Sequence, residues 1–264
     1  MPLEDIHFDT FDGRSIPLSE ISEDAVIALL DAIPPLDSPK YEEIAGGDWP
    51  EEDDLVLEED DLVLGYVGEK GGAFAYPLKI LNFHEIVNDV IDDIPVLISY
   101  CPLCRSGIVY HRRLGGITLT FGNTSALYES DLVMVDRETN SYWWQVAGQA
   151  IVGTLSGETL TPLPSTVLTW AEWKEIHPDS KILSRDTGFR RNYSRDPFAR
   201  YDEAVDSGRF PFPVSEKALD RRLTPAAVVL GVSANNVSRA LSLGTARGRG
   251  CERHHKRTTS CHLL

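Results

Sequence analysis

Cys101 and Cys104 are the residues of this chain whose type and spacing best suit chemistry. They form a Cys-Pro-Leu-Cys pair directly after the apolar run at 94–100. Two thiols at this spacing can bind one metal ion, because a turn after a strand directs both sulfurs to one side. They can also form a redox dithiol, in which the second thiol resolves a mixed disulfide. A third interpretation is that both are ordinary packed side chains.

The segments around this pair are expected to be mainly strands. The continuous apolar run at 94–100 predicts a strand covered on both faces, so the thiols lie at its exit. The β-branched segment that follows, Gly107–Tyr110, does not begin a helix, so no helix N-terminus is expected to stabilise a thiolate. A glycine-rich turn predicts a hairpin, and five further runs suggest an antiparallel meander: 62–67 with 73–78, then 107–112, 117–121, 132–135, 142–146 and 150–155.

Two helices are predicted from capping signals. Ser22 is expected to cap a helix over 22–33, which ends before Pro34. Thr169 and Glu172 fit a capping box for a helix that runs to about residue 177. Trp170 and Trp173 share one face of that helix and are expected in the core. The chain is therefore predicted to have an α+β fold, mainly antiparallel β-sheet with a few short helices.

The sequence divides into three parts. Residues 1–60 are an acidic segment with one helix, 61–223 a β-rich core domain, and 224–264 the start of a repeat followed by an atypical tail. Val228–Val232 echoes Leu62–Tyr66, which suggests that a second copy of the hairpin begins there. From Asn235 onward the chain has six Lys and Arg residues and one acid. Its Cys and His residues lack a strand or helix pattern that would fix ligand geometry, so we expect this basic tail to be disordered.

Composition narrows the choice of partners. The chain has 41 Asp and Glu residues against 25 Lys and Arg, a formal charge of -16. Such a surface repels nucleic acid and anionic membranes, so neither is an expected partner, and other partners stay unknown. This acidity is similar to that of proteins from salt-loving archaea. No apolar run approaches the roughly 20 residues of a membrane span, and the first residues lack a secretion signal, so a cytoplasmic location is expected.

Eight separated motifs form a joint pattern that is more specific than the Cys pair alone: Ile33–Lys40, Val63–Gly65, Ala75–Leu78, His84–Asp89, Tyr100–Cys104, Phe121–Gly122, Asp136–Thr139 and Leu183–Gly188. The pattern resembles the family catalogued as domain of unknown function 3179 (DUF3179), over roughly residues 30 to 232. The resemblance implies no established reaction. Members often repeat the Val-Leu-Gly and Ala-Tyr-Pro-Leu elements in a second half, whereas here that half is missing after Gly231.

His84, from the His-Glu-Ile-Val-Asn-Asp motif, is the predicted third metal ligand beside Cys101 and Cys104. Glu85 or Asp89 could orient its ring. Thiolate and imidazole ligands suit zinc, copper or iron. His111 is a candidate for a fourth ligand. Strong zinc signatures contain two Cys pairs, or one Cys pair and a spaced His pair, so this incomplete pattern leaves the metal interpretation open.

We therefore predict metal binding through Cys101, Cys104 and His84. The alternatives are a dithiol redox protein and a non-catalytic β-rich binding or scaffold domain. The usual hydrolase and phosphate-binding signatures are absent from the sequence: there is no Gly-x-Ser-x-Gly, no His-Glu-x-x-His and no phosphate-binding glycine loop. Whether the protein is an enzyme stays open at this point.

Overall fold

The structure is a computed structural model that describes residues 2–11, 14–44, 57–224, 227–234 and 237–242. These residues form an α+β fold with mainly antiparallel sheets and a few short helices, as the sequence predicts. The chain divides into two compact units, Met1–Leu219 and Asp220–Leu264. The acidic N-terminal segment contributes strands to sheets of the first unit.

A six-stranded antiparallel sheet contains the part of the predicted meander from β11 onward, whereas the run expected at 107–112 lies in a different sheet. The order of the six-stranded sheet is β14-β13-β12-β11-β1-β2. The strands are β1 (Ile6–Asp9), β2 (Ser15–Pro17), β11 (Phe121–Tyr128), β12 (Asp131–Asp136), β13 (Tyr142–Trp144) and β14 (Gln149–Val152). A 3-10 turn, η1 (Leu3–Asp5), precedes β1, and α1 (Glu23–Leu29) packs on one face of the sheet with its predicted cap, Ser22. The strand expected at 117–121 is instead a small ribbon, β9 (Arg113–Leu114) with β10 (Ile117–Thr118), followed by the long β11.

The Cys pair belongs to a second, four-stranded sheet of order β15-β8-β7-β6. Its strands are β6 (Ile86–Ile91), β7 (Ile94–Cys101), β8 (Ser106–His111) and β15 (Thr161–Leu163). Strand β7 is buried on both faces, as its apolar run predicts. Val96, Ile98 and Tyr100 face the core shared with the third sheet. Leu97 and Cys101 face the core shared with the first sheet, because side chains alternate along a strand.

A third, five-stranded sheet has the order β16-β4-β5-β17-β3, and only β5 and β17 are parallel. Its strands are β3 (Tyr41–Glu43), β4 (Leu62–Val67), β5 (Ala73–Pro77), β16 (Ser165–Thr169) and β17 (Lys181–Leu183). Helix α3 (Trp170–Ile176) begins with the predicted capping box and buries both of its tryptophans. Gly65 lets Trp173 lie directly on β4, since an added Cβ would be 2.0 Å from the indole. Helices α2 (Leu78–His84) and α4 (Ala199–Asp206) complete the first unit.

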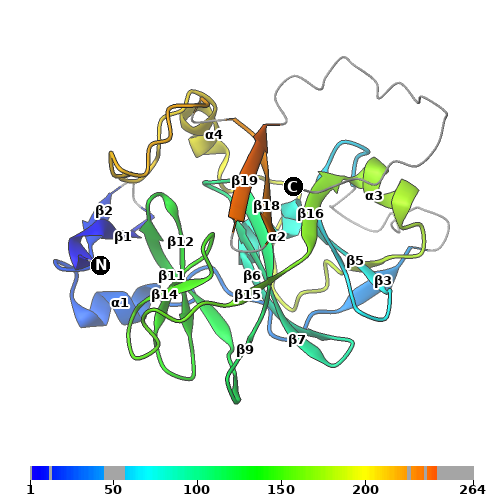
Figure 1. The fold of residues 1–264 in the computed structure, drawn as a ribbon, viewed down its shortest axis with the longest axis horizontal. Coiled ribbons are helices and arrows are strands. Elements are labelled where there is room, and N and C mark those ends of the chain that lie inside the picture. Colours follow the sequence, from blue (N-terminus) through cyan, green and yellow to red (C-terminus); the bar gives the residue numbers. More distant parts are fainter. Residues whose placement is uncertain (1, 12–13, 45–56, 225–226, 235–236, 243–264) are drawn as a thin grey trace. The chain divides into compact units, whose positions relative to one another are not determined.

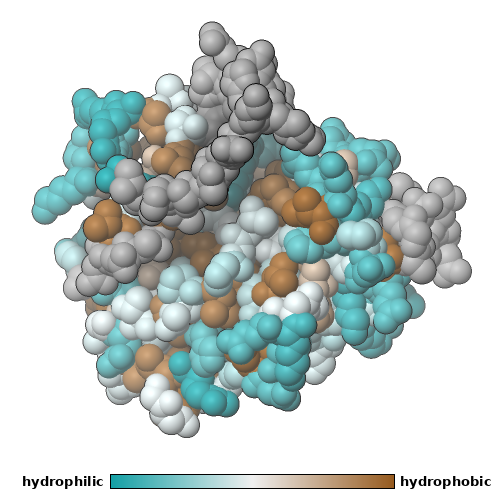
Figure 2. All heavy atoms as spheres, turned by 45° about the vertical axis from the view of Figure 1, so that its right-hand side comes forward, coloured by the Kyte–Doolittle hydropathy of each residue, from teal (hydrophilic) through white to brown (hydrophobic). Residues whose placement is uncertain are grey.

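The four-stranded sheet lies between the other two sheets of the first unit (Figure 1). Strand β6 contacts β11 on one side, and β8 contacts β16 and β4 on the other. Hydrophobic side chains fill both interfaces between the sheets. On the surface shown in Figure 2, hydrophobic residues occur in small groups separated by hydrophilic ones. The Cys pair therefore sits at the interface of the first two sheets.

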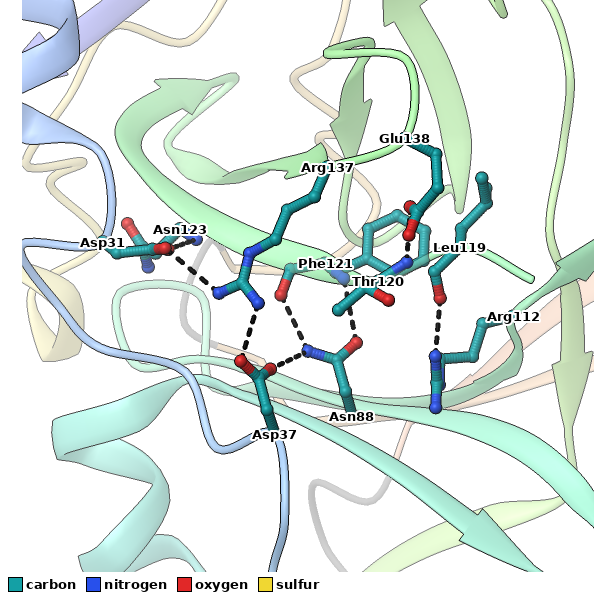
Figure 3. A network of polar contacts seen from close by, with 10 residues as sticks. All are labelled: Asp31, Asp37, Asn88, Arg112, Leu119, Thr120, Phe121, Asn123, Arg137 and Glu138. Carbon is teal, nitrogen blue, oxygen red and sulfur yellow. Dashed lines mark hydrogen bonds and ion pairs between the residues drawn. The ribbon is translucent and has the colours of Figure 1, made fainter. Parts of the chain in front are cut away.

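Several of the family-like motifs form one polar network that joins the first two sheets (Figure 3). Arg137 donates to Asp31 at 3.1 Å and to Asp37 at 2.6 Å. Asn88 donates to Asp37 and to the carbonyl of Phe121, and its own carbonyl oxygen accepts from the Phe121 amide. The motif residues in this network therefore connect β6, β11 and the 31–37 segment.

Arg112 is the buried member of this region. Its guanidinium donates to the backbone carbonyls of Val96, Leu119 and Asp89. Burial lowers the pKa of Arg112, and these carbonyls satisfy its donors without a carboxylate contact. The contacts support a structural role for Arg112 in holding β6, β7 and the β10–β11 junction together.

The second unit contains an antiparallel hairpin of β18 (Val229–Ala234) and β19 (Val237–Ser242). Gly231 pairs with Ala240, which repeats the pairing of Gly65 with Ala75 in the first hairpin. The surroundings differ, because nothing lies within 4 Å of a Cβ added at Gly231. Within the tail from Asn235 that we expected to be disordered, residues 237–242 form β19, and the part from 243 onward, with its Cys and His residues, lies outside the described residues.

Candidate metal centre

The two thiols lie on the tight connection between β7 and β8. Cys101 is the last residue of β7 and pairs with Ser106, the first residue of β8. Arg105 has a positive φ of 52°, which turns the chain back into β8. The Cys104 Sγ lies 3.8 Å from the Cys101 carbonyl oxygen and within 4.8 Å of the Cys101 sulfur, so both side chains lie on the same side of the turn.

Asp131 completes a group of three potential ligands. The Cys104 Sγ donates to Asp131 Oδ1 at 2.9 Å, and the Val146 amide donates to Asp131 Oδ2 at 2.9 Å. One ligand atom each from Cys101, Cys104 and Asp131 lies within 4.8 Å of the other two. Asp131 begins β12 of the first sheet, so the two sheets together build the group.

Ionisation is opposed throughout this group, with burial among the causes. Burial raises the pKa of Asp131 to about 6 and also raises the pKa of the Cys101 thiol. The hydrogen bond with Cys101 is the largest cause that raises the pKa of Cys104, followed by burial and the Asp131 charge. Three acids that each resist ionisation beside the others suit a site that a cation would occupy, because a bound cation reverses these shifts.

Nearby cationic charge is directed away from the sulfurs. Arg105 follows Cys104 in the turn, and its guanidinium donates to Asp206 at 2.7 Å and to Asp202 at 3.1 Å. Both carboxylates belong to α4. The chain after Cys104 enters β8, as predicted, so no helix begins at the thiols.

A small cavity lies beside Cys101. It has a volume of about 30 Å³ and is lined also by Glu85, Asn123, Asp9 and Ser125, among others. Glu85 is buried, its Oε2 accepts from Asn123 Nδ2 at 2.6 Å, and burial raises its pKa to about 8. The space is large enough for a water molecule.

His84 has other partners than the sulfurs. Its Nδ1 contacts the Pro34 carbonyl at 2.7 Å and its Nε2 contacts the Tyr193 hydroxyl at 2.7 Å. The described group of potential ligands contains Asp131 and does not contain His84. Burial lowers the pKa of His84 to about 4. The structure therefore brings together Cys101 and Cys104, and it places the imidazole in a separate hydrogen-bond chain.

The residues expected around His84 are also engaged elsewhere. Asp89 accepts from the Tyr41 hydroxyl at 2.5 Å, and Glu85 accepts from Asn123. His111, the candidate fourth ligand, ends β8, and its Nδ1 accepts from the Arg113 amide at 3.1 Å. Among the described residues, His111 is likewise not part of the three-residue group.

A comparison with known protein families identifies the family of this chain. Residues 30–260 match the family described as a protein of unknown function, DUF3179. The chain belongs to the DUF3179 family. The match confirms the resemblance seen in the motifs, and it continues beyond residue 232, where we expected it to end. No curated protein and no solved structure matches this DUF3179 chain.

Asp131 is the site residue of this DUF3179 member that sequence reasoning did not find. It is 27 positions from Cys104, and its neighbourhood, Glu129-Ser130-Asp131, resembles any polar turn before a strand. The available signal was an acid at the first position of an otherwise apolar strand, which favours a partner for that carboxylate.

A separate observation is that none of the described helices has the length and apolar character of a bilayer span.

Proposed function

We propose that this protein binds a transition metal ion through Cys101, Cys104 and Asp131, with zinc as the preferred ion. The observation that carries the proposal is the convergence of two thiol sulfurs and a buried carboxylate within 4.8 Å of one another. Asp131 replaces His84 as the third ligand in this proposal.

The donor set favours zinc among the candidate ions. Zinc binds thiolate and carboxylate ligands in a tetrahedral arrangement, and sites with three protein ligands keep a fourth position for water or another small ligand. Copper(I) and iron also accept thiolates, although a carboxylate is a poor ligand for copper(I). The protein ligands must be deprotonated, so binding releases protons and strengthens as the pH rises.

Gln145 provides a second observation in support. Its Nε2 donates to Ser99 Oγ at 2.9 Å and to the carbonyl of Ser106 at 3.3 Å, and Ser106 is the β-partner of Cys101. Its Oε1 is buried and has no hydrogen-bond partner among the described residues. A buried acceptor is costly to leave unpaired. Water on a bound ion would supply a donor in this region.

Metal content after purification under reducing conditions tests the proposal. We expect about one equivalent of zinc per chain, and a cobalt-substituted form with the charge-transfer absorption of thiolate ligands. Cys104→Ser and Asp131→Asn should lose the metal, whereas His84→Gln should keep it. Retention by both ligand variants, or absence of bound metal from the wild type after incubation with zinc, contradicts the proposal.

A dithiol redox function is the second candidate, and the contact of Cys104 with Asp131 is the observation that favours it. Asp131 could accept the Cys104 proton, after which the thiolate attacks a substrate disulfide and Cys101 releases the reduced dithiol product. Two thiols give one disulfide, and the two electrons reduce the substrate disulfide. The raised pKa values of both thiols oppose this role, because only the thiolate attacks.

The two candidates differ in one measurement. A redox centre gives a reversible two-electron titration of Cys101 and Cys104 in chelator-treated protein, with a potential above that of structural disulfides. A metal centre is protected from alkylation and oxidation by the bound ion. Alkylation rates with and without zinc therefore separate the two functions.

A further inference from the structure

A second cavity lies away from the proposed metal centre and uses two of the family-like motifs. It has a volume of about 220 Å³ and lies between segments 35–40 and 183–189. Backbone contacts fix both walls: the Ser184 amide donates to the Lys40 carbonyl at 2.8 Å, and Leu183 pairs with Tyr41. Leu36 forms a bridge to Val87 of β6. The positions of both cavity walls are therefore set by backbone hydrogen bonds.

A directional hydrogen-bond chain ends at this cavity. The Pro34 carbonyl can only accept, so His84 carries its proton on Nδ1 and its Nε2 accepts from the Tyr193 hydroxyl. Tyr193 has one hydrogen, so at its 2.5 Å contact with Thr187 Oγ1 it must accept. Thr187 lines the cavity with its hydrogen already donated, and its oxygen also accepts from the Phe189 amide at 3.3 Å, so it can offer one remaining lone pair to a ligand.

Other wall oxygens are acceptors for the same reason. Ser184 Oγ donates to Glu42 at 2.5 Å and accepts from the Asp186 amide at 3.1 Å, which leaves one lone pair for another donor. Asp37 is a carboxylate held by Arg137 and Asn88. Thr187, Ser184 and Asp37 thus favour a ligand that brings hydrogen-bond donors, while Lys40 and Ser38 of the same wall can also donate.

The charges of the cavity wall are balanced. Asp37 pairs with Arg137 at 2.6 Å, and Lys40 pairs with Asp186 at 2.6 Å. An anion or a cation would have to break one of these pairs or remain unpaired. The balance favours a neutral ligand.

The wall also offers an apolar surface. Phe189 lines the cavity with 41% of its surface exposed, and its ring lies 5.4 Å from that of His84. Pro35 and Pro39 add two rigid rings to the lining. Flat apolar faces beside hydroxyl acceptors match a molecule with C–H groups on one face and hydroxyls at its edge.

We propose that this cavity binds a neutral polyhydroxylated molecule of monosaccharide size. At about 30 Å³ per water in the liquid, the volume corresponds to roughly seven waters, which is smaller than a drug-sized pocket. The proposal does not rest on the metal centre, because none of the three proposed ligands lines this cavity.

Ligand-detected NMR with the full chain tests the proposal. The probes are neutral monosaccharides and inositol, with glucuronate and glucosamine as charged analogues of the same size. We expect saturable binding of at least one neutral probe in the millimolar range, and at least fivefold weaker binding of the charged analogues.

Two variants locate the binding. Phe189→Ala and Thr187→Val should each weaken binding about fivefold, through the loss of the apolar face and of the acceptor. Phe210→Ala is a matched control, since Phe210 is 43% exposed and does not line the cavity. Cys104→Ser should leave saccharide binding unchanged. Absence of saturation by every neutral probe, or equal binding by the Phe189, Thr187 and Phe210 variants, overturns the proposal.

Discussion

His84 and Glu85 are consecutive in the sequence and both are buried, yet they serve two different regions. His84 is the last residue of α2, and its two ring nitrogens are saturated by Pro34 and Tyr193. Glu85 follows with a positive φ of 57° and lines the cavity beside Cys101. The positive φ at Glu85 therefore separates the His84 hydrogen-bond chain from the buried acids beside Cys101.

The difference shows how to tell a structural polar cluster from a ligand site. In the His84 chain every donor has an acceptor, and the chain ends at Thr187, which keeps one open lone pair at the second cavity. In the group around Asp131 the pKa of each acid is raised. Burial is the largest cause at Asp131 and Cys101, where hydrogen bonds offset it only in part, and the hydrogen bond with Cys101 is the largest cause at Cys104. Under the proposed function, an ion would stabilise the second arrangement and not the first.

The largest effect that would sharpen the comparison is the loss of metal affinity in Asp131→Asn. Removal of a ligand oxygen should weaken cobalt binding by at least about 100-fold. Loss of a residue that only hydrogen-bonds to a ligand typically weakens metal affinity by about 10- to 100-fold, so loss of a ligand should cost at least the upper value. His84→Gln, which alters the separate hydrogen-bond chain, should change the cobalt affinity less than threefold. Competition titration with a chromophoric chelator measures both, and similar losses in the two variants would break the comparison.

The next effect is the pH dependence of stability from Glu85. Its pKa is raised to about 8, so the folded state keeps a proton that the unfolded state loses above about pH 4.5, and stability falls as the pH rises through this window. Metal-free Glu85→Gln should therefore be more stable than the wild type by about 2 kcal/mol more at pH 7 than at pH 5. Urea unfolding at the two pH values measures this, and parallel pH profiles would contradict it.

His84 should show the opposite sign. Its pKa is lowered to about 4, so the unfolded state binds a proton below pH 6.5 that the folded state refuses, and stability falls as the pH drops from 6.5 toward 4. The wild type should lose about 1.5 kcal/mol more than His84→Gln between pH 6.5 and pH 5. The same comparison in a Glu85→Gln background isolates the contribution of His84, because the pH dependences from His84 and Glu85 otherwise offset each other between pH 6.5 and pH 5.

The smallest effect is expected at Thr187. Thr187→Val removes the donor to Tyr193 and should cost about 1 kcal/mol of stability with no change in metal affinity. Thermal unfolding at constant pH measures the loss. A loss of metal on this substitution would show that the two regions are coupled.

Much of the fold could be predicted because local patterns and tertiary packing agree. The β4–β5 hairpin, the buried strand before Cys101 and the capping box at Thr169 all follow from short-range rules. Helix α2 was missed because its sequence, Leu78–His84, lies between two strands and has no side-chain cap at Pro77. Strand β11 was missed apart from Phe121, because its middle is polar, Asn123-Thr124-Ser125, and only tertiary contacts bury these residues.

The site could be predicted only in part. The Cys pair is visible because its spacing is local. Asp131 is not, because its role depends on the docking of two sheets. The position of His84 depends on Tyr193, which is 109 residues away, and no spacing rule gives such a contact.

The irregularity in β11 has a consequence for how the length of this chain can vary. Between the pairs Asn123–Met134 and Ala126–Val133 the strand carries two extra residues, Thr124 and Ser125. A shift of one residue would invert every later side chain in the strand, whereas a shift of two restores the alternation. Loss of both residues would thus leave the inward pattern intact while removing Ser125 from the cavity wall. Natural indels at this point are expected in pairs, and homologues without the pair should have a differently shaped cavity beside Cys101.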